Sequence, residues 1–229
     1  MVKYFFSIFF IVFLNIPVKA DSIPSISRGG MLYDRWYQVI DAPKPESTHP
    51  AWPKSNSKTG ASTHRCKSCH GWDYKGKNGD YSTGKYMTGI KGIESYIGKE
   101  KKEIISILTN ELHGFGDKMS TDDLNDLALF VSKGQVDFTK FIDPETNLVK
   151  IGNVKKGKEY FETVCAKCHG KDGKLIEDMA PLGKLAHKNP WEVLHKIING
   201  QPGKKMPSLR AFDLDVVADI MSYIQTLKK

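Results

Sequence analysis

The sequence predicts an all-α protein built from two tandem copies of one plan. Apolar residues recur at helical spacing in several segments, and neither half shows the sustained alternation typical of a β-strand. A Cys-x-x-Cys-His motif occurs twice. The last helical segment of each half shows the same apolar face when the two are aligned at an offset of 93 residues. Such internal similarity indicates a repeated structural unit.

The first element, residues 1–20, has the pattern of a secretory signal. A lysine near the start precedes an apolar run from Phe5 to Ile16, and small residues lead up to Ala20. The run is shorter than the roughly 20 residues that span a bilayer, so cleavage is expected, with an uncleaved membrane anchor as the alternative. The mature chain would start near Asp21, in the periplasm or an equivalent extracytoplasmic compartment, without a membrane span.

The charge of the mature chain is moderately positive. Loss of Lys3 and Lys19 with the signal lowers the formal net charge from +8 to +6. The surplus is spread along the chain in mixed patches such as KEKKE at 99–103, which favours solvated faces. The alternative is a docking face for an acidic partner, with salt-sensitive encounter. Nothing in the pattern indicates nucleic-acid binding.

The four cysteines fall in two motifs, CKSCH at 66–70 and CAKCH at 165–169. An exported protein could use them in two disulfides, but the histidine directly after each pair argues otherwise. At this spacing two thiols add to the two vinyl groups of haem while the adjacent histidine reaches the iron. A zinc site needs four gathered ligands, and each motif offers three. The sequence therefore predicts two covalent haem c groups. The attaching residues are Cys66, Cys69, Cys165 and Cys168, and the first axial ligands are His70 and His169.

The second copy, residues 155–229, is the compact one. A short helix leads from Gly157 into the CAKCH motif, and Asn189 with Pro190 starts a further helix that Gly200 ends. An amphipathic helix closes the chain.

With CAKCHG, a loop containing Pro181 and the pair Met206-Pro207, this region resembles the class I cytochrome c family over roughly residues 150–229. The resemblance implies that the first and last helices pack together around one haem. It also implies that His169 and Met206 are the axial ligands and that the Pro181 carbonyl orients His169.

The first copy, residues 21–132, is stretched. Gly30 is taken to mirror Gly157, and Tyr33 to match Tyr160. Cys66 then follows its glycine by 36 residues where Cys165 follows by 8, so an insertion of 28 residues is expected at about 38–65. It is rich in Pro, Ser and Lys and predicts a loop that wraps the haem edge, or else a partner-binding loop.

The linker between the copies, residues 133–154, predicts an extended strap with a turn at 143–144. The expected fold is therefore two tandem class I cytochrome c domains. Each would be a small helical bundle around one covalent haem c, the first with a loop insertion before its Cys-x-x-Cys-His motif.

The second ligand of the first haem is either His113 or Met119. Subtracting the offset of 93 from Met206 gives His113. Met119 has a structural role of its own, since Ser120 can cap the next helix and Met119 can pair with Leu124 as a hydrophobic staple. We therefore favour His113. Met119 is the alternative if a shortened loop brings it to the ligand position instead.

Other histidines and methionines are weaker candidates. His49 is expected to be an incidental surface residue, and Met87 to pack on the haem face. We expect His187 and His195 to be surface or satisfied residues. His64 lies too close to the attachment site to reach the opposite face of the same haem.

These features favour a dihaem electron-transfer cytochrome rather than an enzyme. A thioether ligand raises the potential relative to a second imidazole, so a His/His haem and a His/Met haem would differ in potential. The partners would be redox proteins: a donor dehydrogenase or quinol enzyme and an acceptor cytochrome or reductase. The alternatives are a haem enzyme resembling dihaem dehydrogenases or peroxidases, or a tightly bound cytochrome subunit of a dehydrogenase complex. Thiosulfate dehydrogenases use an additional cysteine on iron, and here all four are assigned to attachment.

Overall fold

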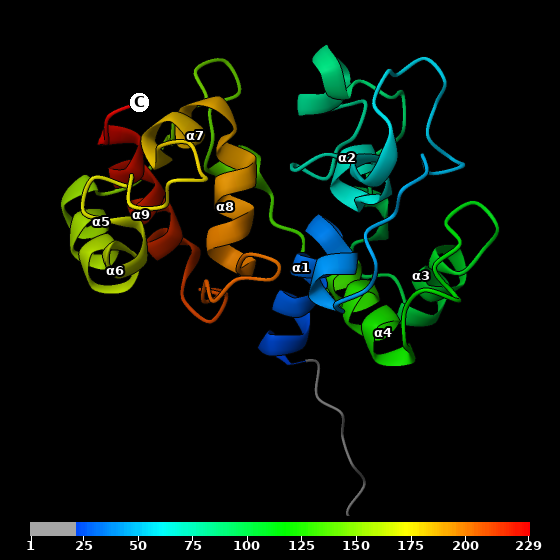
Figure 1. Ribbon diagram of the computed structural model, residues 1–229. Helices are drawn as coiled ribbons and strands as arrows, with labels where there is room; N and C mark the ends of the chain where they lie inside the picture. Colours follow the sequence, from blue (N-terminus) through cyan, green and yellow to red (C-terminus); the bar gives the residue numbers. More distant parts are fainter. Residues whose placement is uncertain (1–21) are drawn as a thin grey trace, which may run out of the picture.

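The computed structural model describes residues 22–229, so the predicted signal at 1–20 lies outside the described residues (Figure 1). Helices joined by loops make up this part of the chain. Among residues 22–229, β-structure is limited to isolated bridges between Gly76 and Lys91 and between Ile142 and Val149. The predicted all-α class is confirmed. None of the described helices combines the length and apolar character needed to cross a membrane.

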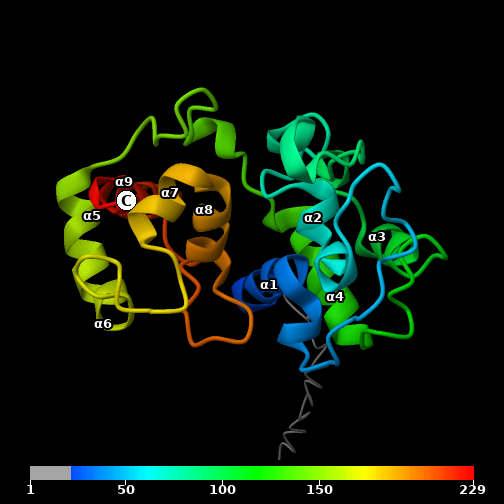
Figure 2. The same cartoon turned by 45° about the horizontal axis from the view of Figure 1, so that its top comes forward.

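The helices form two groups with α1 (Ile23–Val39) between them (Figures 1 and 2). The N-terminal half, as we call residues 22–132, contributes α1 and three further helices: α2 (Cys66–His70), α3 (Lys101–Leu108) and α4 (Thr121–Leu129), which runs on as a π-helical turn, η5 (Phe130–Gly134).

The C-terminal half, residues 155–229, contains most of the second group. Its helices are α5 (Val154–Tyr160), continued by the π-helical turn η7 (Phe161–Cys165), then α6 (Ala166–His169), α7 (Leu182–Lys188), α8 (Pro190–Asn199) and α9 (Leu214–Thr226).

Each half crosses its first helix over its last at a glycine. A Cβ added at Gly29 would overlap the backbone carbonyl of Asp126 on α4, and one added at Gly157 would overlap that of Asp219 on α9. The two carbonyls are separated by the predicted offset of 93. Only a residue without a side chain permits this close approach of two backbones.

An aromatic pair beside each crossing repeats the same arrangement. The rings of Tyr33 and Phe130 have centroids 5.4 Å apart, and those of Phe161 and Tyr223 are 5.3 Å apart. The expected matches of Gly30 with Gly157 and of Tyr33 with Tyr160 were therefore wrong by one residue. The glycine at the N-terminal crossing is Gly29, and Tyr33 corresponds to Phe161.

The predicted helix boundaries at two caps are confirmed. Asn189 accepts a hydrogen bond from the Glu192 amide at the start of α8, with Pro190 in its first turn. Ser120 and Asp123 form a reciprocal capping box at the start of α4. Such a cap satisfies amide donors that have no partner within the helix.

The linker, residues 133–154, packs against the core rather than running free. Phe138, in the 3₁₀ turn η6 (Phe138–Lys140), and Ile142 are buried, so the strap is extended only in part. The expected turn is present, because the Asp143 carboxylate accepts a hydrogen bond from the Glu145 amide.

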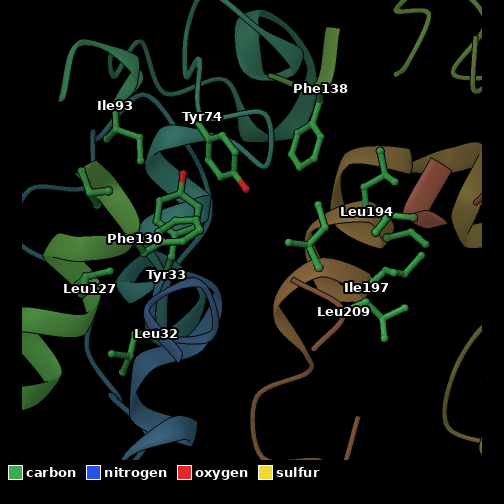
Figure 3. Close-up of a cluster of buried hydrophobic side chains, with 14 of the residues drawn as sticks. Leu32, Tyr33, Tyr74, Ile93, Leu127, Phe130, Phe138, Leu194, Ile197 and Leu209 are labelled. Atoms are coloured by element: carbon green, nitrogen blue, oxygen red, sulfur yellow. The ribbon is translucent and has the colours of Figure 1, made fainter. Parts of the chain in front are cut away.

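The two halves share a buried interface in which α1 lies against α8. Apolar side chains from both sides pack near it, among them Tyr33, Phe130 and Leu194 (Figure 3). His195 of α8 is fully buried there; its Nε2 donates to the Gly30 carbonyl at 2.9 Å and its Nδ1 accepts from the Tyr74 hydroxyl at 2.8 Å.

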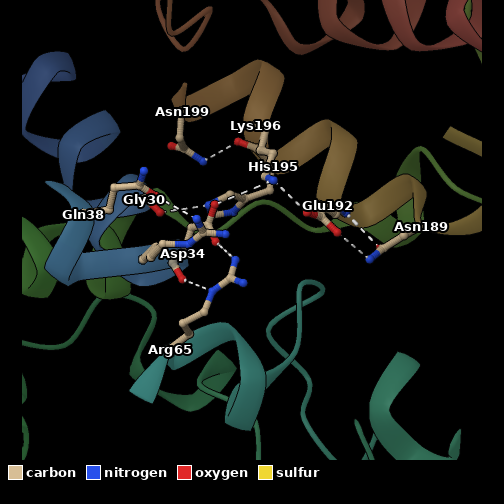
Figure 4. A network of polar contacts seen from close by, with 10 residues as sticks. Gly30, Asp34, Gln38, Arg65, Asn189, Glu192, His195, Lys196 and Asn199 are labelled. Carbon is tan, nitrogen blue, oxygen red and sulfur yellow. Dashed lines mark hydrogen bonds and ion pairs between the residues drawn. The ribbon is translucent and has the colours of Figure 1, made fainter. Parts of the chain in front are cut away.

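Charged side chains also meet at this interface (Figure 4). Asp34 of α1 is fully buried, forms an ion pair with Arg65 and lies 3.9 Å from the Lys196 ammonium. The halves are thus joined by polar contacts of His195 and Lys196 as well as by apolar contacts.

Candidate metal centres

A cavity of about 300 Å³ lies in the N-terminal half, at the small end of the range for ligand pockets. Its walls are mostly apolar. They include Ile93 from the loop after α2, Ile104 and Leu108 from α3, and Leu127 from α4. The whole predicted first motif opens into it, since Cys66, Cys69 and His70 line one side.

The imidazoles of His70 and His113 face each other across this cavity. Their ring centroids are 6.4 Å apart and their planes are inclined by 20°. That separation is too long for direct ring stacking. Two metal–imidazole nitrogen bonds of about 2.0 Å, with about 1.1 Å from each nitrogen to its ring centre, span nearly the same distance. The pair therefore fits a metal ion held between two imidazoles.

His70 is held in the tautomer that such a ligand needs. Its Nδ1–H donates a hydrogen bond to the Lys91 carbonyl at 2.8 Å. The lone pair of Nε2 is therefore available to coordinate a metal. Burial lowers the pKa of His70 to about 4 and also lowers that of His113. Both rings are therefore neutral at pH 7, as metal coordination requires.

Met119, the alternative ligand, lies elsewhere. Its side chain is 6% exposed, belongs to the apolar core and does not line the cavity. It directly precedes the Ser120 cap of α4. The geometry thus favours His113 over Met119 as the partner of His70.

The insertion supplies a wall of the cavity, and His49 is the side chain of it that the sequence analysis misplaced. His49 was expected to be an incidental surface residue, and that was wrong: it lines the cavity and is half-buried. The Ala51 amide donates to its Nδ1 at 3.1 Å, so its Nε2–H donates to the His113 carbonyl at 3.3 Å. His49 therefore supports the segment that carries His113.

His64 also lines this wall, with its ring centroid 4.9 Å from that of His49. Its Nε2 bonds the Ser47 carbonyl at 2.9 Å. The insertion thus wraps the cavity, as the first of its two interpretations expected. A Pro-rich segment without periodicity gives no signal for which of its side chains turn inward.

Three other side chains can now be placed. Met87 was expected on the haem face, but it is 53% exposed and lies outside the cavity lining, where Ile90 and Lys91 of the same loop stand instead. His187 bonds the Gly183 carbonyl within α7 at 2.7 Å, and His195 is satisfied at the interface between the halves, so both are confirmed as satisfied residues.

The cysteines are not arranged as redox-active thiols. Burial raises the pKa of Cys66 and of Cys69 to about 12 and that of Cys165 to about 11. A reactive dithiol needs a lowered pKa. Nor does the described part of the chain gather three or more His, Cys, Asp or Glu into a site for a bare metal ion.

In the second motif, Cys165 ends η7, and Cys168 and His169 lie on α6. The His169 Nδ1 is buried without a hydrogen-bond partner. The expected bond to the Pro181 carbonyl is therefore not made. That carbonyl instead accepts the first hydrogen bond of α7, from the Leu185 amide at 3.0 Å.

Met206 lies on the loop between α8 and α9, half-buried against the core. No hydrogen bond or ring contact joins it to His169 in the described part of the chain.

Apolar side chains around the second motif point to a group that covers them. Val164 precedes Cys165 and is 41% exposed, and Leu175, whose amide bonds the His169 carbonyl, is 61% exposed. These two exposed side chains and the unpartnered imidazole nitrogen of His169 are compatible with a large apolar cofactor attached at this motif.

Comparison with known proteins identifies the C-terminal half. Residues 152–224 match the family model described as cytochrome C oxidase, cbb3-type, subunit III. No curated protein matches the chain. Among solved structures, a chain of a reducing HAO-like protein complex from Kuenenia stuttgartiensis is 13% identical over 82% of this chain and 100% of that chain, with a TM-score of 0.31.

The match covers residues 152–224, less than half of the chain, and indicates similarity to a cytochrome c domain there. Domains of this class bind haem c covalently and serve in electron transfer, alone or as haem-binding subunits of complexes.

Proposed function

We propose that the protein is an exported dihaem cytochrome that passes single electrons between redox partners. One observation carries the proposal: a second Cys-x-x-Cys-His motif, outside the matched domain, opens into a cavity where His70 and His113 stand 6.4 Å apart, centroid to centroid. In this proposal Cys66 and Cys69 attach a haem c there, and the two imidazoles are its axial ligands.

The C-terminal site has a different ligand set in this proposal. Cys165 and Cys168 attach the haem, and His169 and Met206 are the axial ligands. Haem would supply reversible one-electron redox chemistry at both sites, and a thioether ligand from Met206 would give the C-terminal site the higher potential, which favours transfer toward that site.

The surrounding residues favour electron carriage over catalysis at the first site. The His70 ring is oriented by the Lys91 carbonyl, and the His113 Nδ1 lies 3.3 Å from the Asn110 side-chain oxygen, so each imidazole has its own hydrogen-bond partner. Two imidazoles that both held an iron would leave no open coordination position for a substrate.

The partner at the C-terminal half is proposed to be acidic. Residues 155–229 contain fourteen Lys and Arg against nine Asp and Glu, so most of the mature chain's surplus lies there and not evenly along the sequence. Complementary charge raises the rate of encounter and makes it sensitive to salt.

The test is a redox titration of the purified, exported protein with its haem counted. The proposal expects two haems per chain by haemochrome absorbance and mass spectrometry, a mature N-terminus near Asp21 and two one-electron steps at separate potentials. A Cys66→Ala, Cys69→Ala double variant should lose the lower step. One haem per chain, or the loss of the higher step in that variant, would refute the assignment.

A further inference from the structure

The loop that carries Met206, residues 200–210, is anchored to the N-terminal half at its beginning. Gly200 ends α8 with φ +94°, and a Cβ added there would lie 2.9 Å from the Met206 carbonyl and 3.3 Å from the Met31 sulfur of α1. Gly203 lies closely against the Gln38 side chain, also on α1. The first half of the loop thus rests on α1.

The loop is hydrogen-bonded to α1 just after Met206. The Ser208 hydroxyl has one proton, which it donates to the Ile198 carbonyl at 2.6 Å. Its contact with the Ser27 hydroxyl, 2.8 Å long, must therefore be donated by Ser27. Ser27 is buried, so water cannot readily replace its partner, and loss of this hydrogen bond costs free energy.

Arg210 holds the far end of the loop. Its guanidinium donates to the Asn199 side-chain oxygen at 2.6 Å and to the Gly134 carbonyl at 2.9 Å. Gly134 is the last residue of η5, where helical carbonyls lack partners within the helix and carry partial negative charge. Arg210, the last residue of the Met206 loop, therefore caps the C-terminal end of η5.

We propose that the N-terminal half positions Met206 on the second haem iron through Ser27 and Arg210. The inference rests on the proposed His169/Met206 ligation. A thioether is a neutral ligand. The conformational entropy that the loop loses when Met206 binds opposes formation of the sulfur–iron bond. Anchoring the loop at Ser208 and Arg210 reduces the ordering cost of bringing the sulfur to the iron. Ser27 and Arg210 act as positioning residues, and both lie outside the haem-attachment motif at 165–169.

The experiment uses the full holoprotein and free imidazole as a probe that displaces methionine from ferric haem. Loss of the Met–iron charge-transfer band gives the imidazole affinity. Ser27→Ala removes one hydrogen bond worth about 1 kcal/mol, so imidazole should bind about fivefold more tightly. Arg210→Lys, which cannot reach both Asn199 and Gly134, should give at least the same shift.

Two matched variants serve as controls. Ser25→Ala changes a serine on α1 that bonds Ser22, and Lys150→Arg exchanges a linker cation bonded to the Thr139 carbonyl. Both should keep the wild-type imidazole affinity. Far-UV circular dichroism and the His/His signal of the first haem check that each variant is folded.

The outcomes separate this inference from the function on which it rests. Tighter imidazole binding in both test variants with unchanged controls supports the positioning role. Unchanged affinity in folded Ser27→Ala and Arg210→Lys, with the band intact, overturns it while the ligation stands. Absence of the band from the wild-type protein, or its survival in Met206→Ala, overturns both.

Discussion

Acidification should destabilise the protein through His195. This imidazole is fully buried between the halves, with its Nε2–H on the Gly30 carbonyl and its Nδ1 accepting from Tyr74. Burial lowers its pKa to about 4, against opposing contributions from Asp34 and the Gly30 bond. In the unfolded chain its pKa is about 6.5. Between these values only the unfolded state takes up the proton.

This difference in proton uptake sets both the direction and the size of the change in stability with pH. Stability is fully retained above about pH 6.5, falls as the pH drops and levels off below about pH 4. At pH 5 the loss is about 2 kcal/mol relative to pH 7, with a ceiling of about 3 kcal/mol from the whole pKa difference. No other group needs to change its contacts for this loss to occur.

The assay is guanidinium unfolding followed by far-UV circular dichroism at pH 7 and pH 5. In His195→Gln the amide can still donate to Gly30 and accept from Tyr74 but cannot titrate. The variant should lose about 2 kcal/mol less than wild type over this interval. His187→Gln, which alters a histidine bonded within α7, controls for loss of a histidine elsewhere. Equal pH dependence in wild type and His195→Gln would refute the reasoning.

Three further predictions concern stability at pH 7. Asp34→Asn leaves Arg65 without its buried carboxylate and should cost about 3–5 kcal/mol, seen as a lower midpoint in guanidinium. Gly157→Ala drives a methyl group into the Asp219 carbonyl at the α5–α9 crossing and should cost about 1–3 kcal/mol or more, measured in the same way. Ser120→Ala removes the cap of α4 and should cost about 1 kcal/mol, seen as a lower thermal midpoint.

Each of these has a matched control. Asp117→Asn breaks only an exposed pair with Lys118. Gly116→Ala meets nothing closer than 3.5 Å. Ser55→Ala changes an exposed serine. All three should keep the stability of wild type. A test variant as stable as its control would show that the contact in question does not contribute as described.

Sequence spacing placed the final helix of each half correctly, because the predicted offset also relates the two helix crossings. The offset of 93 that pairs Met206 with His113 also pairs Asp219 with Asp126 at the helix crossings. The agreement at the helix crossings supports the alignment, whereas the pairing of Met206 with His113 stays a prediction.

The register of the first helix was not readable in the same way. Gly29 and Gly30 are adjacent, and both are required: Gly29 meets α4, and Gly30 lies against Asn199 of α8. Choosing between them takes the position of α8, which is a tertiary contact. His49 was missed for a similar reason, since its inward direction is set by its bonds to Ala51 and to His113.

The most direct test of the account is near-infrared magnetic circular dichroism of the oxidised protein, recorded for wild type, His113→Ala and Met119→Leu. The account predicts one His/His and one His/Met signal in wild type, loss of the His/His signal in His113→Ala alone, and an unchanged spectrum for Met119→Leu. Two His/Met signals that persist in His113→Ala would contradict it, because Met119 would then be the ligand and the facing imidazoles of His70 and His113 would have no metal between them.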